Sequence, residues 1–135
     1  MKTILVAALL FWVCDAFGAS WGVFTANSYH FNRERTYNET NHGLGYEQDI
    51  SNRWKIQVGY YQNSFSRTSV YAGGTYLPWQ WRDFRFGGTI AAVSGYNSKP
   101  TIIAFPTIQW EGETFGTNIM VLPSVVGIQF KWKFK

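Results

Sequence analysis

Strict alternation of apolar and polar residues limits most strongly what this chain can fold into. At the C-terminus the apolar residues Val126, Ile128, Phe130, Trp132 and Phe134 alternate with Gly127, Gln129, Lys131, Lys133 and Lys135. Residues 54–61 alternate in the same way, beginning at Trp54. Side chains that repeat every two residues share one face of a β-strand, and helical spacing fits neither stretch. The pattern predicts strands with one apolar face and one polar face.

The chain contains about eight such segments, separated by stretches rich in turn-forming residues. The expected strands are 21–31, 43–50, 54–64, 67–77, 84–94, 101–110, 115–122 and 125–134. Most are about as long as a tilted membrane strand, and an even number of strands can close a barrel. With both termini on the periplasmic side, 51–53, 78–83 and 111–114 become inner turns. We therefore predict an all-β fold, an eight-stranded antiparallel up-and-down transmembrane β-barrel.

Alternation alone also fits a soluble antiparallel barrel or sandwich. Three features favour the membrane: an export signal, aromatic residues at the segment ends, and an aromatic-rich final strand. Aromatic residues make up 19% of the chain and charged residues only 15%, which also excludes a disordered protein. Glycines on the presumed inner face, Gly43, Gly45, Gly59, Gly73 and Gly87, suit the narrow interior of an eight-stranded barrel.

The N-terminus has the pattern of a signal peptide over residues 1–19, which leaves 20–135 as the barrel domain. Lys2 precedes an apolar stretch over 4–13, and small residues follow at 16–19. Cleavage after Gly18, Ala19 or Ser20 fits the pattern. A lipoprotein acylated on Cys14 is disfavoured, because the residues before it are large. Export of a barrel predicts a location in the cell outer membrane.

Composition argues against several other classes of protein. The 135 residues form one domain at most, with a net charge of +4 from scattered single cationic residues, so a nucleic-acid partner is not expected. A lone cysteine gives neither a disulfide framework nor a cysteine metal site. The two histidines lack metal-ligand spacing, so we expect no metal and no cofactor. A monomer is expected, and eight strands are too few to open a channel.

From residue 60 onward, several short motifs share the order and spacing of one family. They are Asn63-Ser64-Phe65, Tyr71-Ala72-Gly73-Gly74, the glycine-rich stretch 86–93, Ile103-Ala104-Phe105-Pro106 and Met120-Val121-Leu122-Pro123. Together with the aromatic C-terminal strand, they resemble the lipid A palmitoyltransferase family of Gram-negative outer membranes. A looser match covers Tyr37-Asn38-Glu39. The resemblance implies an eight-stranded barrel that moves a palmitoyl chain from a phospholipid to lipid A or lipopolysaccharide.

The family's activity is associated with a histidine, an aspartate and a serine near the outer rim. The serine corresponds to Ser64, and His30 is the candidate histidine in the first strand, although a gapless alignment places Ala26 there. Asn63 stands at the aspartate position and cannot accept a proton or hold a charge. If the site is a weakened version of the family's, Asn63→Asp should raise acyl transfer.

The residues themselves also bear on this site. The first and third strands both run outward, so His30 and Ser64 should meet at one rim, where a base and a hydroxyl could carry out ester transfer. Asn63 could orient the imidazole or donate to an oxyanion. Equally, Ser64 and Asn63 suit a simple turn, His30 suits an interfacial aromatic belt, and His42 is expected in a loop.

Two prolines and a set of inward charges complete the expectations. Pro106 and Pro123 should weaken strand pairing on the outer side and give lipid lateral access, unless Pro123 merely begins a turn. The charged residues expected inside the barrel are Glu47, Asp49, Lys55, Arg85, Lys131 and Lys133. These charges should pair across strands, Asp49 with Lys55 for example. Phe130→Arg, on the lipid face, should impair folding far more than the inward Lys131→Gln.

Two functions remain open from the sequence. The first is a lipid-modifying acyltransferase with His30 and Ser64 as the reactive pair. The second is a catalytically inactive structural or surface barrel, of which a phage could be the source, and the asparagine at position 63 favours it.

Overall fold

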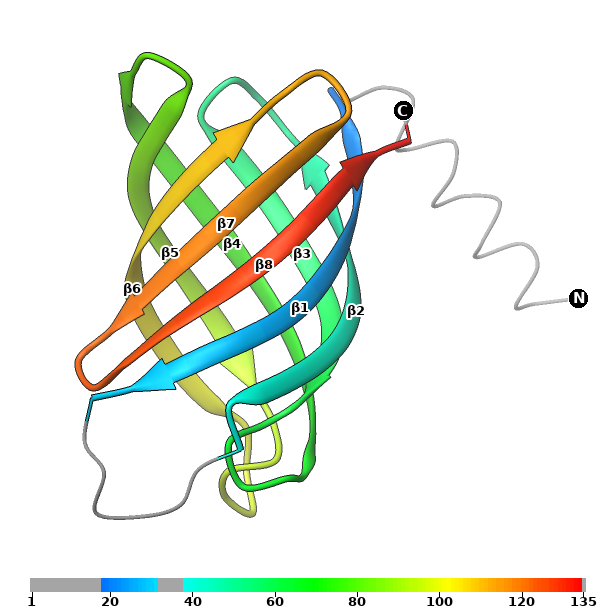
Figure 1. The fold of residues 1–135 in the computed structure, drawn as a ribbon, viewed down its shortest axis with the longest axis vertical. Coiled ribbons are helices and arrows are strands. Elements are labelled where there is room, and N and C mark those ends of the chain that lie inside the picture. The colour runs from blue at the N-terminus through cyan, green and yellow to red at the C-terminus, as the bar shows by residue number, and fades with distance from the viewer. Residues whose placement is uncertain (1–17, 32–37, 135) are drawn as a thin grey trace, which may run out of the picture.

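The computed structural model describes residues 18–31 and 38–134, which form eight strands (Figure 1). The strands are β1 (Ser20–His30), β2 (Thr40–Asp49), β3 (Trp54–Gln62), β4 (Thr68–Trp81), β5 (Phe84–Val93), β6 (Thr101–Glu111), β7 (Phe115–Leu122) and β8 (Val125–Lys133). Residues 1–17 of the expected signal peptide, which was predicted over 1–19, lie outside the described residues, as do residues 32–37 of the expected longest loop.

The strands form one closed antiparallel barrel in which each strand pairs with its neighbours in sequence and β1 pairs with β8. This confirms the predicted eight-stranded up-and-down barrel. In the described part of the chain, no helix is long and apolar enough to cross a membrane.

Connections gather at two opposite ends of the barrel (Figure 1). We call "termini end" the end that carries both ends of the barrel domain and the turns β2–β3, β4–β5 and β6–β7. The opposite end, the "loop end", carries the connections β1–β2, β3–β4, β5–β6 and β7–β8. His30 at the end of β1 and Ser64 after β3 therefore both lie at the loop end.

The distribution of polar and apolar side chains between the interior and the exterior is the reverse of that in a soluble barrel. Ile102 is 69% exposed and Ile90 63% exposed on the outer surface, whereas Lys55 and Lys131 are each 1% exposed in the interior. A contiguous apolar exterior around a polar interior is the distribution that lipid-facing barrels require. The soluble alternative would place these apolar side chains inside, so the structure contradicts it.

The interior toward the termini end holds a cluster of buried charges. The Lys131 ammonium donates to Glu47 at 2.6 Å and to Glu111 at 2.5 Å. Lys55 bonds Asp49, its partner in the register of β2 and β3, and Glu111 at 2.6 Å. This confirms the Asp49–Lys55 pair and adds Glu111, which the sequence placed in a turn. The lysines and carboxylates compensate each other's charge in an interior where little water can solvate them.

Arg85 and Lys133 belong to the same set of inward charges but have different partners. Arg85 Nη1 donates at 3.0 Å to the backbone carbonyl of Asn52 in the β2–β3 turn, outside the charge cluster. The Lys133 ammonium lies 5.0 Å from the ring centroid of Trp21, over which Lys131 also lies at 4.5 Å. Aromatic contact of this kind offsets part of the cost of placing cations inside the barrel.

Two strand boundaries differ from the sequence prediction by three residues or more. β2 begins at Thr40, not at residue 43, and β4 continues to Trp81, through residues expected in a turn. The pairing of β4 with β5 passes from Tyr76 with Gly88 to Trp79 with Phe86, so β4 carries one extra residue. This bulge around Leu77 and Pro78 accommodates the proline, which cannot donate a ladder hydrogen bond. The β4–β5 turn is thereby reduced to Arg82 and Asp83.

Candidate functional site

His30 and Ser64 come together at the loop end of the barrel. His30 Nε2 lies 3.0 Å from Ser64 Oγ, although 34 positions separate the two residues in sequence. His30 is only 6% exposed and Ser64 is half-buried. The expected proximity of the two side chains is therefore confirmed, and the pair has the geometry of a hydroxyl beside its general base.

A bulge in β1 aims His30 into the barrel. Trp21, Val23 and Thr25 point inward and are buried, so strict alternation would turn His30 toward the outer surface. Thr25 pairs with Gln129 of β8 and Asn27 pairs with Ile128, which leaves Ala26 as one extra residue. The extra residue reverses the alternation, as β-bulges do. His30 is consequently inside, whereas Tyr29 is 52% exposed outside.

Asn63 holds the turn that presents Ser64. Its Oδ1 accepts from the backbone N–H groups of Phe65 at 2.9 Å and Arg67 at 3.1 Å. Its Nδ2 donates to Ser69 Oγ at 3.0 Å and to the carbonyl of Gly95 at 3.2 Å. The side chain is fully buried and both of its polar atoms are engaged within the β3–β4 turn and its neighbours. Asn63 is thus placed as a structural turn residue, and the expectation that it orients the imidazole or donates to an oxyanion has no support in its contacts.

Glu39 reaches His30 from the start of β2. Its Oε1 accepts from the His30 backbone N–H at 2.9 Å and lies 3.6 Å from His30 Nδ1. The sequence analysis quoted Glu39 only as part of a loose motif match and gave it no role. The contact joins the end of β1 to the start of β2. The register of this hairpin could have indicated from the sequence that His30 and Glu39 are close, but not that the Glu39 side chain contacts His30.

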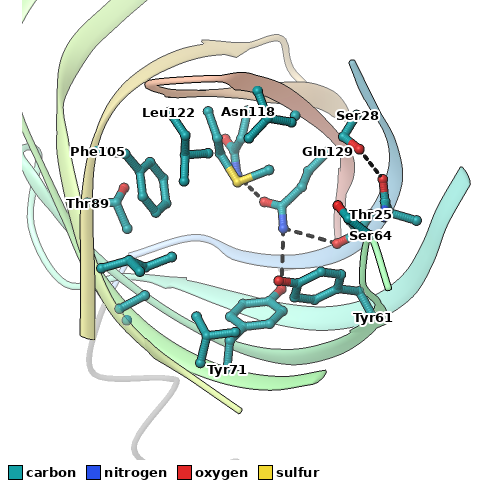
Figure 2. A pocket seen from close by; sticks show the side chains of 18 of the residues that line it. Thr25, Ser28, Tyr61, Ser64, Tyr71, Thr89, Phe105, Asn118, Leu122 and Gln129 are labelled. Carbon is teal, nitrogen blue, oxygen red and sulfur yellow. Dashed lines mark hydrogen bonds between the residues drawn. The ribbon is translucent and has the colours of Figure 1, made fainter. Parts of the chain in front are cut away.

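A cavity of about 440 Å³ lies inside the barrel and is lined by both His30 and Ser64 (Figure 2). Its apolar wall comes from β4 to β7 and includes Tyr71, Val93, Ile103, Phe105, Met120 and Leu122. Figure 2 shows Phe105, Leu122 and Tyr71 directed into the same space as Ser64. The volume is in the range of pockets that hold small-molecule ligands.

Polar side chains line the side of the cavity toward the charge cluster. Gln129 Nε2 donates to Thr25 Oγ1 at 3.1 Å and to Gln57 Oε1 at 3.1 Å, and Gln57 Nε2 donates to Glu47 at 2.8 Å. The hydroxyl of Thr89 bonds those of Thr75 at 2.8 Å and Thr107 at 2.7 Å. These polar groups bond one another. The cavity is therefore apolar on the side formed by β4 to β7 and polar toward the barrel centre.

Tyr96, from the β5–β6 connection, contributes a neutral hydroxyl to the cavity wall. Its hydroxyl lies 2.8 Å from that of Tyr61. Burial and the hydrogen bond to Tyr61 raise the pKa of Tyr96 above the ordinary value for a phenol. The Tyr96 hydroxyl therefore stays protonated, and this part of the wall carries no charge.

β6 and β7 pair along only part of their length. Their register joins Thr107 with Met120 and ends at Glu111 with Gly116. The loop-end half of β6, residues 101–106, pairs with β5 but not with β7. Pro106 lies at the beginning of this unpaired stretch and faces outward, exposed, where its missing N–H removes a possible donor. The weakened strand pairing expected near Pro106 is therefore observed, whereas lateral access for lipid stays a prediction.

Pro123 has a simpler place. It lies with Ser124 in the short β7–β8 connection, after Leu122, and is exposed. The turn interpretation therefore describes its position, although the connection borders the same side of the barrel as the β6–β7 opening. His42 was expected in a loop, but it lies in β2 because this strand begins at Thr40, and it packs on the outer surface with its ring 6.1 Å from that of Phe24.

Comparison with known proteins gives distant structural likeness only. No protein-family model matches the chain, and no curated protein matches it. Among solved structures, the barrel is similar to the outer membrane protein Ail of Yersinia pestis, whose backbone structure was determined in a phospholipid bilayer nanodisc, with a TM-score of 0.49 and 11% sequence identity. The match covers 87% of this chain and 99% of the Ail chain. A likeness at this level gives no information about activity.

Proposed function

We propose that this chain is an outer-membrane acyltransferase of the lipid A palmitoyltransferase type, which moves an acyl chain from a phospholipid to lipid A. The observation that carries the proposal is the 3.0 Å contact between His30 Nε2 and Ser64 Oγ on the wall of a cavity with an apolar side. A barrel with a purely structural role has no need of a histidine and a serine paired on the wall of an apolar cavity.

The barrel exterior supports the membrane location. Exposed aromatic residues lie near the strand ends toward the termini end, among them Trp54 at 53%, Trp79 at 68% and Trp81 at 60% exposure. Between the two ends the exposed surface is apolar, with aliphatic residues such as Val58 and Ile90 and aromatic ones such as Phe130. Aromatic residues at the level of the headgroups and aliphatic residues between them are typical of outer-membrane barrels. With both termini on the periplasmic side, as the sequence predicts, the loop end with His30 and Ser64 would lie on the outer-leaflet side.

The proposed reaction begins at Ser64. His30 Nε2 takes the hydroxyl proton while Oγ attacks the ester carbonyl of the phospholipid, and the bond from the carbonyl carbon to the glycerol oxygen breaks. The proton passes from His30 to that oxygen, which releases a lysophospholipid. A hydroxyl of lipid A then attacks the carbonyl carbon of the Ser64 ester and gives its proton to His30. The bond from that carbon to Ser64 Oγ breaks, His30 passes the proton to Oγ, and lipid A leaves with the acyl chain.

The unpaired stretch between β6 and β7 gives the acyl chain a path. Ile103 and Phe105 of β6 and Leu122 of β7 line the cavity and also flank the opening. Lipid next to the barrel could therefore insert its chain sideways, without carrying it through the polar loop end. Pro106 would keep this path open, because it cannot donate a ladder hydrogen bond.

Mass spectrometry of lipid A from cells that express the chain tests the proposal. Wild type should add one acyl chain to lipid A, whereas Ser64→Ala should abolish the addition because no hydroxyl remains beside His30. Ser66→Ala is the matched control, since Ser66 is exposed in the same turn and should leave acylation unchanged. Unmodified lipid A in cells with folded wild-type protein would contradict the proposal and favour the non-enzymatic barrel.

A disulfide across the opening tests the lateral path. Continuing the register Thr107 with Met120 places Pro106 opposite Val121, and both point outward. Oxidised Pro106→Cys/Val121→Cys should reduce acyl addition, and reduction of the disulfide should restore it. The control pair Ile108→Cys/Ile119→Cys joins residues that are already paired and should not change the activity. Full activity with the opening closed would contradict this path.

A further inference from the structure

We infer that Glu39 is the positioning carboxylate of the His30–Ser64 pair and takes the place of the acid that position 63 lacks. The inference rests on the proposed function, because it assigns a partner to the base of that reaction. Glu39 would hold the imidazole in the productive tautomer and stabilise its protonated form.

Two contacts bring Glu39 to this position. Its Oε1 accepts from the backbone N–H of His30 at 2.9 Å, and its backbone carbonyl accepts from the N–H of Ser28 at 3.0 Å. The side chain of Glu39 is thus hydrogen-bonded to His30, and its main chain to Ser28, at the C-terminal end of β1. The carboxylate cannot move far from the ring without breaking these bonds.

The ring of His30 lies between the carboxylate and the hydroxyl. Nδ1 is 3.6 Å from Glu39 Oε1, and Nε2 is 3.0 Å from Ser64 Oγ. A carboxylate accepts only, so it favours the tautomer that carries the proton on Nδ1. That tautomer leaves the lone pair of Nε2 facing the serine, as a general base requires.

The distance to Nδ1 is longer than a hydrogen bond but short enough for a strong charge interaction. Glu39 is 31% and His30 8% exposed in their side chains, so solvent screens the pair only partly. When His30 takes the serine proton, the new imidazolium attracts the carboxylate, and an approach of about 1 Å or less would close the gap to a charge-assisted hydrogen bond. Catalytic contacts are often loose in the absence of substrate and tighten in the complex.

Other described carboxylates are too far along the barrel to serve. Glu47, Asp49 and Glu111 bond the lysines of the charge cluster, and Asp83 and Glu113 lie in turns at the termini end. Asn63 is engaged by its turn. Among the residues that the structure describes, Glu39 is the acid placed at the loop end beside His30.

The experiment compares wild type, Glu39→Gln and Glu39→Asp by acyl transfer from phospholipid to lipid A in detergent. Glu39→Gln keeps the size of the side chain and removes its charge, so the rate should fall on the order of 10²-fold or more. Glu39→Asp keeps the charge and should retain more activity than the glutamine variant. Glu113→Gln removes an exposed carboxylate at the opposite end and should match wild type. A wild-type rate in folded Glu39→Gln would overturn the role of Glu39 and leave the proposed function intact.

Nitrogen NMR of the histidine rings gives a second measurement that needs no activity. In neutral wild-type His30 the proton should lie on Nδ1, and Glu39→Gln should shift the Nδ1 signal and raise the share of the other tautomer. His42, on the outer surface, is the internal control and should not change. If wild type proves inactive, a shift confined to His30 still supports the positioning by Glu39, whereas an unchanged His30 signal overturns it.

Discussion

At the scale of single residues, Asn63 stands directly before the proposed nucleophile but serves the backbone around it. Its two acceptor contacts and two donor contacts use both ends of the amide. An aspartate would keep the acceptor contacts with Phe65 and Arg67 but could not donate to the Gly95 carbonyl. The resemblance of the Asn63-Ser64-Phe65 motif to an Asp-Ser-Phe motif therefore does not imply an equal role for its first residue.

Asn63→Asp should consequently destabilise the barrel without raising acyl transfer. Placing a carboxylate oxygen against the Gly95 carbonyl leaves a buried acceptor without its donor, which costs about 1–3 kcal/mol. Urea unfolding in detergent measures this change, with Asn52→Asp in the exposed β2–β3 turn as the control. A stable Asn63→Asp protein with increased activity would restore the interpretation of position 63 as a catalytic position.

At the scale of elements, β8 shows how a strand of the barrel divides between two environments. Phe130 is 48% exposed on the outer face, and its neighbour Lys131 is 1% exposed within the charge cluster. The predicted alternation of this strand is confirmed. The sequence predicted that Lys131→Gln would impair folding far less than Phe130→Arg. The structure changes this expectation, because Lys131 bonds two carboxylates that would remain buried without it.

Phe130→Arg and Lys131→Gln should therefore destabilise the barrel by similar amounts. An arginine on the lipid face near the middle of the membrane costs about 2–4 kcal/mol. Removing one partner from a buried ion pair costs about 3–5 kcal/mol, because the remaining charge is left uncompensated. Unfolding in lipid vesicles compares the two variants. A negligible effect of Lys131→Gln would show that Lys55, which also contacts Glu47 and Glu111, compensates both carboxylates together with water.

Short pairing between β6 and β7 is another property of elements. Eight strands close the barrel, but the loop-end half of β6 lacks β7 as a hydrogen-bonding neighbour. Pro106 explains the loss of one hydrogen-bond donor, but it does not explain why the whole stretch 101–106 is unpaired with β7. The separation of the strands also depends on where β7 ends, at Leu122, before the Pro123-Ser124 turn.

At the scale of the whole molecule, the closed barrel with a polar interior and an apolar exterior predicts a characteristic behaviour on gels. The unheated protein should migrate differently from the heated protein, because a closed barrel leaves no strand edge from which detergent could unfold it. Cell fractionation should recover the chain in the outer membrane. Recovery as a soluble periplasmic protein, with no change in migration on heating, would contradict the membrane assignment.

The sequence by itself determined the barrel, because alternation is a local property that each strand carries in its own residues. Seven of the eight strands begin within one residue of the predicted start, and Glu47, Lys55 and Lys131, which the alternation selected as inward, are buried. The shared loop end of His30 and Ser64 also followed from the sequence, since strand direction alone decides it.

Only the tertiary structure decided which side chains face one another at that end. Alternation continued from Thr25 would have turned His30 outward, and the extra residue at Ala26 that reverses it is visible only in the pairing of β1 with β8. Glu39 reaches His30 through the register between two strands, and Glu111 joins the charge cluster in the same way. These contacts depend on bulges and register, which the local sequence pattern does not specify.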